Sequence, residues 1–233
     1  MPRASWERKL LSDFQRRAHH FIQNPPADDE HLDWFAIMQH HGAPTRLLDW
    51  TSSPYVGLYF AIEKAQASDC CVWAIDSRWL LQRARKLLRS EDQSIRLHSS
   101  NLRLRNKRLN DQLFSTDISH VVIPFDPTRM NERVAAQQGL FLCTLSKSSD
   151  LSYNLLQMIR EDPESANNPV LQRIIIRSEC RIPFLRELNR MNINRATLFP
   201  GLDGFARSLG LSLEADLDPE FATGQGVTLT ATP

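Results

Sequence analysis

Four short apolar runs, each bounded by polar residues, constrain the fold of this chain more than any other feature. Runs of this length that are rich in β-branched and aromatic residues are typical of strands in a protein core. Amphipathic segments with helical spacing lie between them, so the sequence predicts an α+β fold. We expect a single domain with a small mixed or antiparallel sheet and flanking helices. The four runs are Cys70–Ile75, His120–Phe125, Leu140–Thr144 and Leu171–Ile176, the last with three consecutive isoleucines that suit a buried position.

The first predicted helix covers Trp6–Ile22, where apolar residues recur every three or four positions. Its expected apolar face consists of Trp6, Leu10, Phe14, Ala18 and Phe21. Thr45–Trp50 is expected to be a short turn or extended piece, and Thr197–Leu209 the last ordered element. The other predicted helices are His31–His41, Pro54–Ala67, Asp76–Leu88, Met130–Gln138 (helix or turn), Ser148–Glu161 and Ile182–Met191.

Composition and charge narrow the class of protein. The chain has 233 residues, of which 42% are hydrophobic, and we expect one domain over residues 1–212 and a mobile polar tail over residues 213–233. The net charge of +1 gives no global argument for a nucleic-acid or anionic membrane partner. No long apolar run or signal peptide is recognisable, and the four cysteines lack zinc spacing. The sequence therefore predicts a cytoplasmic protein without a membrane partner or bound metal, and it does not predict an oligomeric state.

The stretch Gln39–Ala61 contains two histidines, an arginine, an aspartate, a tryptophan and several hydroxyl residues, which are residue types common in binding and catalytic sites. Its sequence is QHHGAPTRLLDWTSSPYVGLYFA. Gly42 is expected to end one helix, and Ser53 followed by Pro54 is expected to begin the next. Thr51 and Ser52 would then lie at the positive end of that helix, a favourable place for a phosphate. These hydroxyls can also hydrogen-bond a ribose.

Three further residues of this stretch suit a nucleotide-like ligand. Arg46 offers a planar fork of donors for phosphate or carboxylate, and Trp50 offers a stacking face. Asp49 could orient Arg46 or act as an acid or base, and His40 could titrate near neutral pH. The alternative is structural, with an Arg46–Asp49 salt bridge and Trp50 buried in the core.

A basic segment follows between Arg78 and Arg108. It contains ten cations opposed only by Glu91 and Asp92. A nucleic-acid contact is one interpretation. The other is a solvated helix and loop balanced by acidic residues elsewhere, which the lack of interleaved aromatic residues favours.

The stretch Gln39–Ala61 closely resembles the signature segment of the FRG domain. Two later segments are also similar to that family, ERVAAQQGLF, with Arg133, Gln137, Gly139 and Phe141, and RIIIRSECRIPFLRELNRMNINRATLFPGLDGFARSL. The resemblance spans Phe14–Leu209. The Phe-Arg-Gly triplet that names the family, usually on an early strand, does not occur in this chain. We expect either a natural short form or a fragment without that strand.

A weaker resemblance is to ADP-ribosyltransferases, in which a Ser-Thr-Ser-like strand precedes a helix. Thr51-Ser52-Ser53 before PYVGLYFA looks like that element, and Gln137 or Gln138 stands near the position of a later Glu or Gln. This resemblance implies NAD as a ligand, with the nicotinamide ribose near Thr51 and Ser52. The catalytic candidates are Thr51, Gln137 and His40, and the ligand-binding candidates are Arg46, Asp49, Trp50, Ser52, Arg133 and Gln138.

Two other functions remain open at this point. One is a module that binds a nucleotide or nucleic acid without turnover, in which Arg46 would carry the affinity. The other is a purely structural domain, in which the polar residues of the central stretch satisfy one another.

Overall fold

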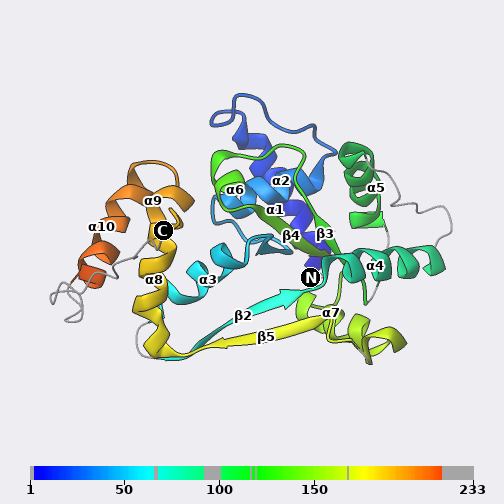
Figure 1. Ribbon diagram of the computed structural model, residues 1–233. Coiled ribbons are helices and arrows are strands. Elements are labelled where there is room, and N and C mark those ends of the chain that lie inside the picture. The colour runs from blue at the N-terminus through cyan, green and yellow to red at the C-terminus, as the bar shows by residue number, and fades with distance from the viewer. Residues whose placement is uncertain are drawn as a thin grey trace.

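Two antiparallel sheets, with helices on several sides, organise the computed structural model (Figure 1), which confirms the α+β class. The structure describes residues 3–65, 68–91, 101–115, 117–118, 120–166 and 168–216. One sheet has the order β1-β4-β3 and the other pairs β2 with β5. The strands are β1 (Leu47–Thr51), β2 (Cys70–Ile75), β3 (Val122–Phe125), β4 (Gly139–Thr144) and β5 (Leu171–Ile176).

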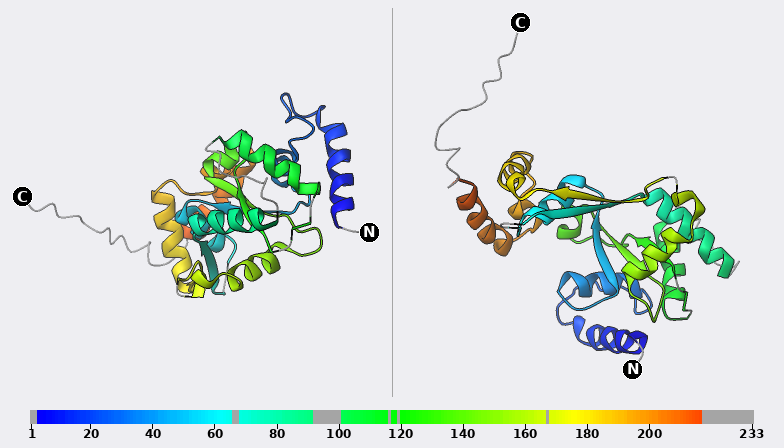
Figure 2. Two further views of the ribbon diagram at one scale, coloured as in Figure 1. Left: turned by 90° about the vertical axis from the view of Figure 1, so that its right-hand side faces the viewer. Right: turned by 90° about the horizontal axis from the view of Figure 1, so that it is seen from below.

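The helices gather into groups around these sheets. The described helices are α1 (Arg3–Ala18), α2 (His31–His40), α3 (Pro54–Ile62), α4 (Ser77–Glu91), α5 (Leu102–Ser115), α6 (Glu132–Ala136), α7 (Leu151–Arg160), α8 (Arg181–Arg190), α9 (Arg195–Leu198) and α10 (Leu202–Asp216), with short 3-10 turns at Pro163–Ala166 and Ser178–Cys180. Helices α8, α9 and α10 lie together on one side, and α4 and α5 lie on the opposite side (Figures 1 and 2). Of the predicted tail over residues 213–233, residues 213–216 belong to α10 and the rest lie outside the described residues.

The three-stranded sheet carries the main core. Its central strand β4 is buried from Phe141 onward, and Leu142 lies opposite both Leu48 of β1 and Pro124 of β3. Phe141 stacks with Phe125 at a ring-centroid distance of 6.2 Å. The segment predicted as a turn or extended piece thus becomes an edge strand, because its backbone pairs with β4.

The β2–β5 ribbon differs from its prediction. Ile174 is 47% exposed and Ile175 is 53% exposed, so the expectation that the isoleucines of β5 are buried was wrong. Successive residues of a strand face opposite sides. Helix α3 packs against part of one side, where the Val72 side chain lies near Gly57, and neither side is covered completely.

Helix α1 is rotated relative to its predicted apolar face. Trp6 is 51% exposed and Leu10 is also exposed, whereas Glu7, Leu11 and Ala18 are buried. The prediction of the buried face was therefore wrong at Trp6 and Leu10. It was also wrong at Phe21, which is 86% exposed and lies beyond the end of α1 at Ala18. Hydrophobicity alone would bury Trp6, but the helix instead turns a carboxylate inward.

The Glu7 carboxylate pairs with Arg46, which is only 3% exposed. The Arg46 Nε donates to both Glu7 carboxylate oxygens, at 3.2 and 3.1 Å. Its Nη1 donates to the carbonyl oxygens of Leu113 and Thr144, at 3.4 and 3.2 Å, and the guanidinium lies over the Phe114 ring. Arg46 thus joins α1, α5 and β4 at the point where β1 begins.

Replacing Arg46 by alanine should destabilise the protein by about 3–5 kcal/mol, because it removes the guanidinium that pairs with the buried Glu7 carboxylate. The matched control is Arg190→Ala, which removes an exposed pair with Glu187 and should cost less than about 1 kcal/mol. Urea unfolding measures both. Equal losses of stability in the two variants would contradict the structural role of Arg46.

Candidate ligand-binding site

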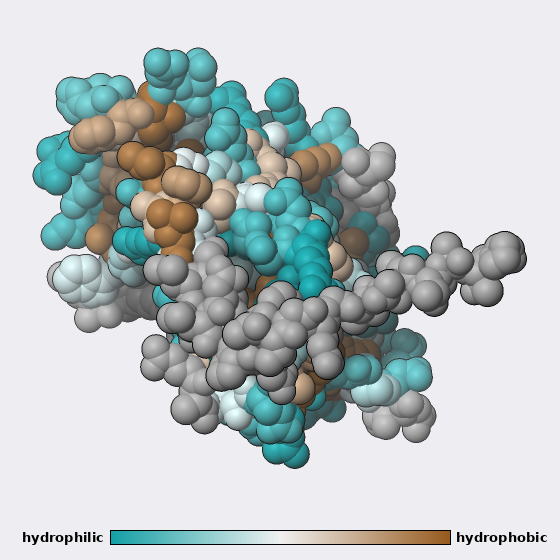
Figure 3. Space-filling model, turned by 60° about the vertical axis from the view of Figure 1, so that its left-hand side comes forward, coloured by the Kyte–Doolittle hydropathy of each residue, from teal (hydrophilic) through white to brown (hydrophobic). Residues whose placement is uncertain are grey.

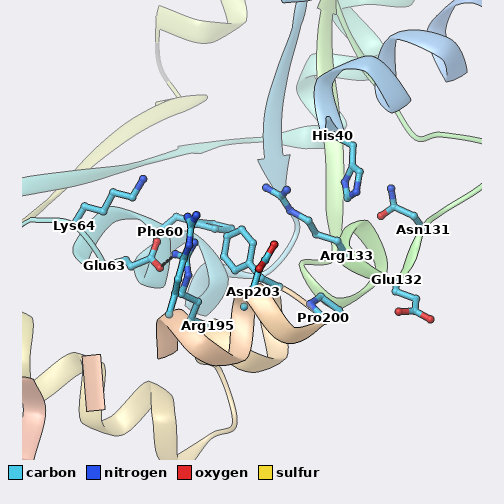
Figure 4. Close-up of a pocket in the computed structure, with 13 residues that line it drawn as sticks. His40, Phe60, Glu63, Lys64, Asn131, Glu132, Arg133, Arg195, Pro200 and Asp203 are labelled. Carbon is cyan, nitrogen blue, oxygen red and sulfur yellow. Dashed lines mark hydrogen bonds and ion pairs between the residues drawn. The ribbon is translucent and has the colours of Figure 1, made fainter. Parts of the chain in front are cut away.

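A cavity of about 830 Å³ opens between the end of α2, the end of α3, α6 and the α9–α10 segment (Figure 4). Its volume is in the range of small-molecule sites in proteins. Its lining combines cations, carboxylates and two aromatic rings. The lining residues are His40, Phe60, Glu63, Lys64, Asn131, Glu132, Arg133, Arg195, Phe199, Pro200, Asp203, Gly204 and Arg207.

Side-chain caps fix the short helices that form two walls of the cavity. The Asn131 Oδ1 accepts the Val134 N–H at 2.8 Å and caps the start of α6, and Asn131 lines the cavity together with Glu132 and Arg133. Asn194 and Thr197 form a reciprocal capping box at α9. These caps hold the backbones that carry the side chains of the site.

Gly204 brings α10 close to the residue that ends α9. A Cβ at this position would lie 1.8 Å from the Phe199 carbonyl oxygen, which no side chain can do without moving the backbone. Glycine is therefore required for the close approach that shapes this wall. The same side of the molecule carries both hydrophobic and hydrophilic residues on its surface (Figure 3).

Phe199 is the centre of the aromatic wall. Its ring meets Phe60 edge-on at a centroid distance of 5.9 Å. Two guanidinium groups lie over the same ring, Arg195 at 4.4 Å and Arg133 at 4.7 Å from its centroid. Such cation–π contacts fix the guanidinium planes against the ring.

The two arginines differ in how their charge is balanced. Arg195 pairs with Glu63, which is 7% exposed and also accepts the Tyr59 hydroxyl at 3.1 Å. Arg133 makes no side-chain hydrogen bond or ion pair within the described part of the chain. Its half-buried guanidinium thus leaves its donors available to an anion in the cavity.

His40 extends from the last turn of α2 near Arg133 (Figure 4). Burial lowers the pKa of His40, and the positive charges of His41 and Arg133 lower it further, while Asp49 opposes this change. The imidazole is therefore mainly neutral at neutral pH. In that form one ring nitrogen can accept a hydrogen bond and the other can donate one.

Thr51, Ser52, Gln137 and Gln138 come together but do not line this cavity. The Thr51 hydroxyl donates to the Gln137 carbonyl at 2.8 Å, and the Ser52 N–H donates to the Gln138 carbonyl at 3.0 Å. The Gln137 side-chain amide donates to the Leu198 carbonyl at 2.9 Å. These polar groups join the end of β1 and α9 to the turn between α6 and β4.

The remaining predicted site residues lie elsewhere. Arg46 pairs with Glu7 in the core. The structural alternative, in which Arg46 pairs with Asp49, was therefore wrong about the acidic residue. The Asp49 carboxylate accepts the Gln39 amide at 3.3 Å, and Trp50 packs half-buried against the main core. Of the predicted candidates, the structure brings only His40 and Arg133 into the cavity.

Sequence reasoning missed most of the lining residues. Phe199, Pro200 and Gly204 lie in the TLFP segment that resembles the FRG domain, and that resemblance was the available signal. Glu63 lies two residues beyond the central stretch. Arg195 and Arg207 also lie in the last segment that resembles the FRG domain, but their position in one cavity with Lys64 depends on contacts between elements distant in sequence.

Some cations of the basic segment make structural contacts within the protein. The Arg83 guanidinium is buried and donates to the Glu161 carbonyl at 2.9 Å, and Arg105 pairs with Asp126 at 2.6 Å. Much of the segment that was interpreted as a loop forms α5, and residues 92–100 lie outside the described residues. Five of its cations are exposed, namely Arg78, Lys86, Arg89, Arg103 and Lys107.

Among the side chains that the structure describes, no three histidines, cysteines, aspartates or glutamates lie close enough to hold a metal ion. A search of the described residues also finds no helix with the length and hydrophobicity needed to cross a membrane.

The family model of the FRG domain matches residues 2–70. The matched part includes the central stretch and the cavity residues His40, Phe60, Glu63 and Lys64. No curated protein and no solved structure matches the chain. These comparisons give no support to the similarity to ADP-ribosyltransferases.

The geometry predicts that Arg133→Gln raises the pKa of His40, because a positive charge that opposes protonation of the imidazole is removed. The pKa should remain below its ordinary value, since burial is the largest cause of the lowering. An NMR titration of the histidine ring protons measures this change, with Arg190→Gln as the charge-matched control. An unchanged or lower His40 pKa in Arg133→Gln would show that the two side chains are not electrostatically coupled.

Proposed function

We propose that this FRG-domain-containing protein binds a nucleotide-like small molecule with a phosphate group in the cavity around Phe199. The observation that carries the proposal is the half-buried Arg133 guanidinium, which lies against an aromatic ring and has no anionic partner among the described residues. A cation held in this way is suited to an anion supplied by a ligand.

The chemistry of Arg133 favours phosphate as that anion. A guanidinium presents parallel N–H donors that can bind two oxygens of one phosphate or carboxylate. The neutral His40 adds a hydrogen-bonding group close to Arg133 without adding a second charge. Together they provide a site for one anionic group at the α2–α6 side of the cavity.

The rings of Phe60 and Phe199 supply the second part of a nucleotide site. They line the same cavity as Arg133, and Phe60 is 40% exposed, so its ring is accessible to a planar base. Aromatic contacts of this kind stabilise ring systems beyond the burial of their area. A phosphate with an attached base therefore fits both the charge and the apolar wall.

NAD and ADP-ribose are members of this ligand class, and they remain the compounds implied by the resemblance to ADP-ribosyltransferases. Thr51 and Gln137 direct their side chains to backbone carbonyls. We therefore confine the proposal to binding and do not assign these two residues a catalytic step.

Isothermal titration with ADP-ribose, NAD and ADP tests this function. We expect saturable binding of at least one compound, and about a tenfold or larger loss of affinity in Arg133→Gln, since a hydrogen-bonded charge contact is removed. Arg190→Gln, on the exposed surface of α8, should bind as the unmodified protein does. Nicotinamide release from NAD is followed in the same samples.

The proposal would be contradicted if none of the three compounds bound, or if Arg133→Gln bound them with unchanged affinity. Circular dichroism of each variant establishes that any lost affinity does not come from unfolding.

A further inference from the structure

The cavity contains a second cation that faces Arg133 from the opposite side. Lys64 lies two residues beyond the end of α3, lines the cavity and makes no hydrogen bond or ion pair with any other described residue. In the view of Figure 4 the Lys64 and Arg133 side chains extend toward each other from opposite walls, and the side chains of Arg195 and Phe60 lie between them. Two cations without an ion-pair partner among the described residues thus line one cavity, although their backbones belong to different elements.

We propose that this region binds a diphosphate group, with one phosphate at Arg133 and the other at Lys64, so that the cavity selects diphosphate-containing nucleotides over monophosphates. The inference rests on the proposed nucleotide function and specifies its ligand. A single phosphate held by the Arg133 fork satisfies only one of the two cations. A second, linked phosphate extends the negative charge toward the other wall.

The carboxylate beside Lys64 does not oppose this arrangement. Glu63 is turned into the protein, where it accepts the Tyr59 hydroxyl and pairs with Arg195. Its negative charge is thus balanced within the wall and does not neutralise Lys64. The pairing of Glu63 with Arg195 leaves the ammonium group as the free charge at the end of α3.

Two other carboxylates line the cavity and limit the net charge. Glu132 extends away from Arg133 and His40, whereas Asp203 rises from α10 toward the centre of the cavity (Figure 4). Arg207, also on α10, lines the same cavity and has no ion pair among the described residues. With Arg195 and Glu63 balancing each other, the three cations Arg133, Lys64 and Arg207 face two carboxylates, so the cavity lining carries a positive excess.

Arg133 and Lys64 suit different phosphates of the diphosphate group. Arg133 is fixed over Phe199 and offers a directional fork, so it is expected to bind either a mono- or a diphosphate. Lys64 is exposed and carries a compact point charge on a flexible stem, which can follow the position of a second phosphate. Lys64 is therefore the residue that distinguishes the two classes of ligand.

Titrations with AMP and ADP on the full chain test the inference at low ionic strength, where exposed charges are least screened. We expect ADP to bind at least about fivefold more tightly than AMP. Lys64→Gln should remove most of this preference by weakening ADP alone. Arg133→Gln should weaken both ligands, and Lys86→Gln, which removes an exposed lysine on α4, should weaken neither.

Equal affinities for AMP and ADP in the unmodified protein would overturn the diphosphate inference and leave nucleotide binding intact. The same conclusion would follow if Lys64→Gln weakened AMP and ADP equally. Failure of both nucleotides, together with ADP-ribose and NAD, to bind would overturn the proposed function itself. The outcomes for the two proposals are therefore distinguishable.

Discussion

The buried ion pair between Arg46 and Glu7 is the contact on which the arrangement of the other elements depends. It lies at the start of β1 and connects this strand to α1, α5 and β4 through the carboxylate and two backbone carbonyls. A guanidinium that is almost fully buried must have these partners, since an unpaired buried charge is strongly destabilising. The position of β1 fixes its last residue, Thr51. It thereby also sets where α3 begins, and the end of α3 forms one side of the cavity.

At the other end of β1, polar contacts connect the sheet to the wall of the candidate ligand-binding cavity. Thr51 bonds to the backbone at Gln137, and the Gln137 amide bonds to the end of α9, which immediately precedes Phe199. The FRG-like segments are thus linked in space, because residues from each of them either line the cavity or hold its walls. Among the described residues Arg195 has an ion-pair partner and Arg133 has none, and this difference is why we propose Arg133 as the contact for an anion.

Local patterns in the sequence were sufficient to predict the class of fold and most elements. The Ser53 cap of α3 and the capped start of α6 are local interactions, and Pro54 at the first turn is a strong signal. The buried face of α1 could not be predicted, because Glu7 is buried by a partner 39 positions away. Arginine and glutamine often contact ligands. Here the side chains of Arg46 and Gln137 instead make contacts within the protein, with Glu7 and with the Leu198 carbonyl, which are distant in sequence. His40 and Arg133 line the cavity because the end of α2 and the start of α6 lie beside it, and their roles as ligand contacts stay predictions.

The central claim is that the cavity around Phe199 is the ligand site and that Arg133 is its anion contact. The most direct measurement is an NMR titration of isotopically labelled protein with ADP, observing backbone amides and arginine side-chain Nε–H groups together. We expect progressive shifts at the Arg133 side chain and at amides of α6 and of the Phe199–Gly204 segment, with the Arg46 side chain unchanged. Shifts confined to the exposed basic surfaces of α4 and α5, with Arg133 unaffected, would contradict the account.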